Sequence, residues 1–86
     1  IIKVNRKRNY YMNSKEIGEY SRKYRKSKQV TLLELGGVDQ IKNLSAFEHG
    51  RSTNVNHLTK YVLLSVSLKD NVDFMSGLTE VVKNGW

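Results

Sequence analysis

The sequence predicts an all-α fold, a compact bundle of about five short helices. Three observations support this class. The 86 residues include no proline, so no position forbids an α-helix. Apolar residues recur at three- and four-residue intervals, the period of an amphipathic helix, and no stretch is rich in strand signals. Capping residues and glycines separate the periodic stretches.

The first element is a basic segment, residues 1–12, in which cations cluster without a helical apolar period. It is either a flexible arm that reaches along a DNA backbone or into the minor groove, or a remnant from upstream of the natural start. In the second case Met12 is the natural first residue. A helix is then expected over 14–27, where Asn13 and Glu16 resemble a capping box. Its buried stripe is Ile17, Tyr20 and Tyr24, and its solvent face carries Lys15, Arg22, Lys23, Arg25, Lys26 and Lys28.

A second helix is expected over about 31–36, because Thr31 and Glu34 form a capping box and Gly36-Gly37 ends the run in a tight turn. A third follows over about 39–49 and is stopped by Gly50. Its inward stripe is Ile41, Leu44 and Phe47. Glu48 should point partly inward, so it needs a partner, either an arginine of the first helix or backbone N–H groups.

A fourth helix is capped by Thr53 or Asn54, and Val55, Leu58, Tyr61, Val62 and Val66 fit its period. A fifth spans about 70–83. One of its faces carries four apolar residues, with Phe74 and Val81 beside them: Val72, Met75, Leu78 and Val82. This wide apolar face either closes the core or joins two copies of the chain as a homodimer.

Positive charge is concentrated in the first third of the chain. The net charge is +7; residues 1–28 hold ten Lys and Arg against two Glu, and the remainder holds five against six acids. A one-sided basic surface suits a polyanion, because neutralised phosphates release counterions. An anionic membrane surface is the rival partner. No apolar run approaches the roughly 20 residues of a membrane span, no signal-peptide pattern is present and cysteine is absent, so we expect a cytoplasmic protein without membrane contact.

The run Leu44-Ser45-x-Phe47-Glu48-x-Gly50 resembles the signature of the lambda-repressor-like, Cro/Xre family of helix-turn-helix DNA-binding domains. The basic end of the first helix, the threonine before the second and the periodicity of the fourth are similar to that family too, over roughly residues 14–68. The segment from Gly36 to Leu44 is shorter than the family pattern. Either Gly37-Val38-Asp39 stands for the family's turn and the second helix is clipped, or Leu33-Glu34 takes the place of its Leu-small pair.

The resemblance implies a helix-turn-helix domain, residues 13–86, that inserts the third helix into the major groove of double-stranded DNA. Hydrogen-bonding and small side chains on this helix are the candidates for base contact, and residues beside it for phosphate contact. The DNA-binding residues predicted in this way are Gln29, Thr31, Gln40, Lys42, Asn43, Ser45, Ala46, His49 and Arg51.

The function predicted from these features is sequence-specific regulation of transcription, by a repressor of phage or bacterial type acting as a homodimer. The alternative is a helix-turn-helix domain used for protein contact, such as an antitoxin or a phage-encoded inhibitor. Sequence-independent DNA binding is a third option. His49 and His57 lie on different expected helices with no acid cluster nearby, and no catalytic or nucleotide-binding spacing is present. We therefore expect no metal, no cofactor and no enzymatic activity.

Overall fold

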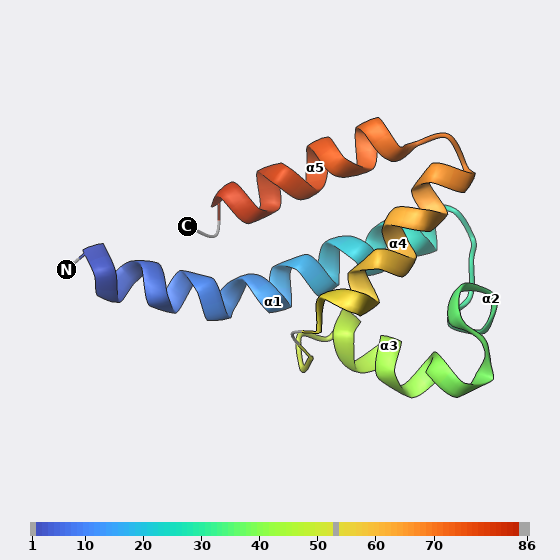
Figure 1. Cartoon of the computed structure of the whole chain (residues 1–86), viewed down its shortest axis with the longest axis horizontal. Helices are drawn as coiled ribbons and strands as arrows, with labels where there is room; N and C mark the ends of the chain where they lie inside the picture. Colours follow the sequence, from blue (N-terminus) through green and yellow to red (C-terminus); the bar gives the residue numbers. More distant parts are fainter. Residues whose placement is uncertain (1, 53, 85–86) are drawn as a thin grey trace.

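The computed structural model describes residues 2–52 and 54–84, with side chains over 14–52 and 54–83 (Figure 1). These residues form five α-helices, α1 (Ile2–Ser27), α2 (Leu32–Gly36), α3 (Ile41–Glu48), α4 (Val55–Ser67) and α5 (Asn71–Asn84). A 3₁₀ turn, η1 (Val38–Gln40), precedes α3, and no strand occurs in the described part of the chain. The predicted all-α class is confirmed.

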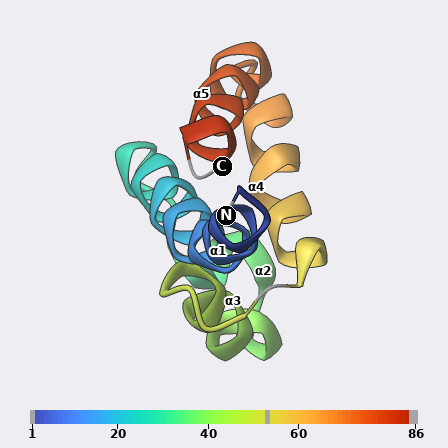
Figure 2. The ribbon, with the colours of Figure 1, turned by 90° about the vertical axis from the view of Figure 1, so that its left-hand side faces the viewer.

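Helix α1 is the axis of the fold. Figure 2, which looks along α1, shows α5 on one side of it, α3 on the opposite side and α4 across the third. The expected start at Ser14 is wrong, because the backbone is already helical from Ile2. No glycine or proline interrupts residues 2–17, so the helix continues through Asn13 and Glu16 and does not begin there. The division of the chain at residue 12 stays a prediction.

The α2 region follows the sequence closely. Thr31 caps α2, and the reciprocal hydrogen bonds with Glu34 that define a capping box are both present. Gly37 ends the helix with φ +84°, a conformation that favours glycine. The chain then turns through η1 into α3. The second helix therefore has only five residues, and the turn lies at 37–40, as in the first of the two alternatives above.

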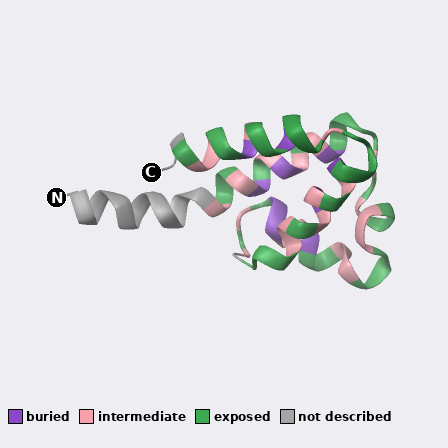
Figure 3. Ribbon diagram, turned by 45° about the horizontal axis from the view of Figure 1, so that its top comes forward, coloured by how far each residue is buried: buried purple, intermediate pink, exposed green. Residues whose placement is uncertain are grey.

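The core lies where the helices meet, as Figure 3 shows by the buried residues on their inner faces. Its buried hydrophobic residues come from α3, α4 and α5 and are Leu44, Phe47, Tyr61, Phe74 and Leu78. The predicted stripe of α1 packs against them, half-buried. On α4, Tyr61, Leu58 and Val62 face the core as expected, whereas Val55 and Val66 are exposed. Asn54 caps this helix, and Thr53 lies outside the described residues.

Helix α5 packs in a different register from the predicted one. Phe74 is 1% exposed and lies between the rings of Tyr20 and Tyr24, with ring centroids 5.3 and 4.7 Å away. This register turns Val72 and Met75 to the surface and buries Leu78. The aromatic contacts explain why the face with Phe74, and not the face with Val72, turns inward, since a phenyl ring contributes more buried area than a valine. Leu78 is thus a core residue and not part of an exposed dimer face.

No helix in the described part of the chain is long and apolar enough to cross a membrane; α1 has the length but is highly charged.

Candidate nucleic-acid interface

Helix α3 has one buried face and one polar face. Leu44, Phe47 and Glu48 are buried, which confirms the predicted inward stripe and the inward Glu48. By helical periodicity, the opposite face is centred on Lys42, Ala46 and His49. Of these three, Lys42 and His49 are exposed and Ala46 is half-buried. Three of the nine predicted DNA-binding residues therefore share the centre of one accessible surface.

Asn43 and Ser45 lie on the two edges of that surface, and Gln40 lies before it. The Asn43 amide nitrogen is 3.4 Å from the Gln40 Oε1, so the two side chains are arranged as one polar pair. Gln40 is half-buried because it packs closely against Gly36 of α2. A Cβ added at Gly36 would lie only 2.9 Å from the Gln40 Cβ. Asn43 is consequently the more accessible member of the pair.

His49 has a defined orientation. Its Nδ1 lies 2.8 Å from the carbonyl oxygen of Ser45, an arrangement in which Nδ1 carries a proton and donates it. In neutral His49 the other ring nitrogen, Nε2, is then an acceptor. Such an acceptor can receive a hydrogen bond from the amino group of a base.

The candidates near the start of α2 differ in availability. The Thr31 backbone N–H and hydroxyl both donate to the Glu34 carboxylate, at 2.8 and 3.1 Å. A carboxylate thus occupies the donors that a phosphate would need, and hydrogen bonds from Thr31 hold the pKa of Glu34 below its usual value. Gln29 is exposed in the turn after α1, with φ +59°, and is the more available of the two candidates for phosphate contact.

Cations of α1 border the C-terminal end of α3. A Cβ added at Gly50 would lie 2.6 Å from the Lys15 Cα, so α1 touches the segment that leads to Arg51. Arg22 also faces α3, because its Nε is 4.0 Å from a Glu48 oxygen. Lys15, Arg22 and Lys26 are spaced by seven and four residues and therefore follow one line along α1. Together with Arg51, which follows α3, these three cations are called the basic margin; Lys42 adds a further cation on the polar face itself.

A buried network fixes α3 against α1 and α4. The Glu48 carboxylate accepts hydrogen bonds from Arg25 Nε at 2.7 Å, Arg25 Nη2 at 3.0 Å and the Tyr61 hydroxyl at 2.6 Å. Arg25 Nη1 also donates to the Val30 carbonyl at 2.7 Å. The bonds to Glu48 raise the pKa of Arg25, and burial raises that of Tyr61, so Arg25 stays charged and Tyr61 neutral.

Arg25 was predicted to lie on the solvent face of α1, and this prediction is wrong. Arg25 is 7% exposed. The partner proposed for Glu48, an arginine of the first helix, is confirmed. The missed signal is the pair of small residues before Arg25, since Gly18 and Ser21 share its face and are both buried. A Cβ at Gly18 would overlap the Phe47 carbonyl oxygen, so this face of α1 approaches α3 closely.

The described residues contain no group of three or more His, Cys, Asp or Glu side chains arranged to hold a metal ion. Comparison of the chain with protein-family models, with curated proteins and with solved structures found no match.

Proposed function

We propose that the protein is a sequence-specific DNA-binding regulator of transcription, a repressor of phage or bacterial type with a lambda-repressor-like helix-turn-helix. In this role α3 enters the major groove and α2 crosses the backbone. The observation that carries the proposal is the division of α3 into a buried face, held by the Arg25–Glu48–Tyr61 network, and an accessible polar face. A rigidly held helix with such a face can present its side chains to base edges in a fixed register.

The basic margin supplies the electrostatic part of this role. Its cations on α1 and around α3 carry the charge that neutralises phosphates on either side of a groove. Arg51 lies at the exit of α3, where an extended side chain can reach the backbone while the helix lies in the groove. The further cations of residues 3–8 belong to the same helix as Lys15, because the backbone is helical from Ile2.

Roles follow from position on the polar face. Lys42 suits guanine and Asn43 suits adenine, and His49 offers an acceptor. Ala46, between them, leaves room for a base edge or the methyl group of thymine. Acting as a homodimer, the protein would read two half-sites about 34 Å apart, one turn of the double helix.

The test is selection of binding sites from random-sequence double-stranded DNA, followed by affinity measurements over a range of salt. A shared sequence motif supports the proposal. Asn43→Ala should relax base preference at one position, whereas Arg51→Ala should weaken all sequences alike and lower the salt slope by about one. Lys83→Ala is the control of matched charge, because α5 lies across α1 from α3 (Figure 2). Uniform, steeply salt-dependent binding without a motif would favour sequence-independent binding instead.

The second candidate function is protein contact, as in an antitoxin or a phage-encoded inhibitor. It is favoured by the exposed large apolar residues of α4, Leu63 at 61% and Val66 at 52%, which lie one helical turn apart. Contiguous exposed apolar surface is a mark of protein interfaces. Absence of DNA binding at low salt by the folded protein would favour this candidate over the regulator.

A further inference from the structure

The start of α3 brings two amide side chains together. Gln40 is the N-cap residue of this helix, and Asn43 is its third residue. In a capping box these are the two positions whose side chains reach each other's backbone, because the first turn places them side by side. The Gln40 side chain makes no capping hydrogen bond to the backbone here. Its Oε1 instead accepts from the Asn43 amide nitrogen at 3.4 Å, so the turn directs one side chain onto the other.

The stem of Gln40 is held by the end of α2. A Cβ added at Gly36 would lie 2.9 Å from the Gln40 Cβ, 3.6 Å from its Cγ and 2.6 Å from the Leu44 Cδ1. Gln40 and Leu44 therefore lie directly against the bare backbone of α2. The Gln40 backbone N–H also donates to the Gly37 carbonyl at 3.1 Å. With its backbone and stem fixed, Gln40 keeps only the freedom to turn its terminal amide.

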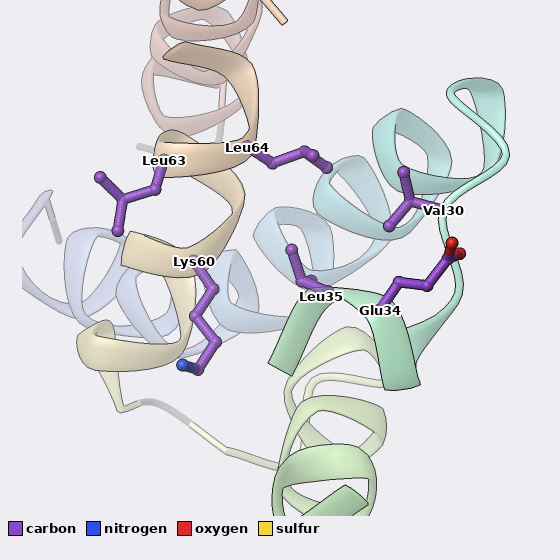
Figure 4. Close-up of a pocket in the computed structure, with 6 residues that line it drawn as sticks. All are labelled: Val30, Glu34, Leu35, Lys60, Leu63 and Leu64. Atoms are coloured by element: carbon purple, nitrogen blue, oxygen red, sulfur yellow. The ribbon is translucent and has the colours of Figure 1, made fainter. Parts of the chain in front are cut away.

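Helix α2 is in turn supported by α4. Leu35 of α2 packs against the core, and with Leu64 of α4 it lines the space between the two helices (Figure 4). The same short helix contacts α3. Since α2 touches both helices, the surface on which Gln40 packs belongs to the folded bundle. A side chain locked by such packing can hold a neighbouring side chain in one geometry.

The Asn43 amide carries two N–H donors and one carbonyl acceptor. Gln40 occupies one donor, which leaves the second N–H and Oδ1 together on the amide. In the major groove adenine presents an acceptor, N7, beside a donor, the N6 amino group, and asparagine binds both at once. Guanine presents two acceptors at the same place and would set one of them against Oδ1. An amide held in this orientation therefore selects adenine over guanine.

We propose that Gln40 is a positioning residue, which orients the Asn43 amide so that α3 reads an adenine at one position of its binding site. This inference rests on the proposed function. It gives Gln40 a role through Asn43, in place of the base contact expected from the sequence. Without Gln40, the Asn43 amide is ordered only on binding, which costs about 2- to 10-fold in affinity for the adenine site. It is then also free to turn its N–H₂ group toward guanine.

The experiment compares affinity for the selected site with affinity for the same site in which guanine replaces the Asn43-dependent adenine. Gln40→Met keeps the side-chain length but removes the acceptor, and should lower this discrimination about 2- to 10-fold without affecting other positions. Gln40→Glu keeps an acceptor oxygen and should retain the discrimination, although its charge weakens binding to every sequence. In the Asn43→Ala background, Gln40→Met should have no further effect on this position. Asn71→Ala, a matched loss of an exposed amide on α5, should leave the discrimination unchanged.

A second measurement uses the free protein and needs no DNA. Nuclear magnetic relaxation of the side-chain amides should show Asn43 more ordered than Asn71. Gln40→Met should remove this difference, and Gln40→Glu should keep it, with urea midpoints confirming that each variant is folded. Equal mobility of the Asn43 and Asn71 amides in the wild type would overturn the inference alone.

The outcomes with DNA also separate the inference from the proposed function. A motif whose Asn43-dependent position is unchanged in Gln40→Met would overturn the positioning role and leave the regulator intact. Relaxation of a different position by Gln40→Met would do the same, because Gln40 would then contact a base itself. Absence of any shared motif would overturn the proposed function, and this role with it.

Discussion

Replacement of Glu48 by glutamine is the sharpest test of how α3 is held. Glu48 is 4% exposed, and its carboxylate is surrounded by three donors from Arg25 and Tyr61. Glutamine keeps the shape but removes the charge and directs an N–H₂ group at one of these donors. Arg25, only 7% exposed, is left as a buried cation without its counter-ion. Loss of one partner of such a pair costs about 3–5 kcal/mol.

That cost is large for this chain. A domain of this length is stable by about 4–13 kcal/mol, so Glu48→Gln removes a substantial part of the total. In urea, where the m-value of a small protein is about 1–3 kcal/mol/M, the unfolding midpoint should fall by about 1–5 M without a change in m. Tyr61→Phe removes one donor and should cost less, about 1.5–3 kcal/mol.

Glu16→Gln, an exposed position on α1, is the matched control and should change stability by less than about 0.5 kcal/mol. A loss below about 1 kcal/mol for Glu48→Gln would refute the reasoning, because Arg25 would then have found solvent or another acceptor. The network would in that case not be what holds α3 in place.

Three further changes have directions that the structure decides. Gly18→Ala should lower the stability of the fold, because its methyl group meets the Phe47 carbonyl. At an exposed helical site the same change would raise stability by about 1 kcal/mol, so the direction of the shift in the urea midpoint tests the close contact. Thr31→Ala should cost about 1 kcal/mol in the same assay by removing the cap of α2. The hydrogen bond from Lys28 lowers the pKa of Asp70 in the folded protein. The stabilisation from this pair is therefore complete above the unfolded pKa of about 3.9 and is lost as pH falls through the lower folded pKa. Asp70→Asn should lower stability at pH 7 and much less at pH 3.

The sequence was most informative where one residue determines one local conformation. The cap at Thr31, the turn at Gly37 and the stop at Gly50 each follow from short-range geometry that few other residues satisfy. The pairing of Glu48 was predictable for a different reason, since a carboxylate on a buried face requires a partner.

The sequence was less informative where competing local signals are equal. The capping pattern at Asn13 is valid in isolation, but a helix that has already formed continues through it at little cost. On α5, two overlapping apolar stripes were available, and only the positions of Tyr20 and Tyr24 on a distant helix select the one that contains Phe74. Such choices depend on tertiary contacts that no local pattern contains.

The candidate interface depends on two groups of residues with different roles, and this separates its failure modes. Gly18, Arg25 and Glu48 determine where α3 lies, so their replacement should lower stability and DNA affinity together. Ala46 is at the centre of the polar face of α3. Ala46→Asp adds a negative charge that would face the major groove of the DNA, and it removes no buried hydrogen bond or ion pair of the Ala46 side chain. This variant should unfold at nearly the wild-type urea midpoint yet lose DNA binding, because like charge with the phosphates opposes entry into the groove. Wild-type affinity in Ala46→Asp would mean that another surface contacts the DNA, however well folded α3 is.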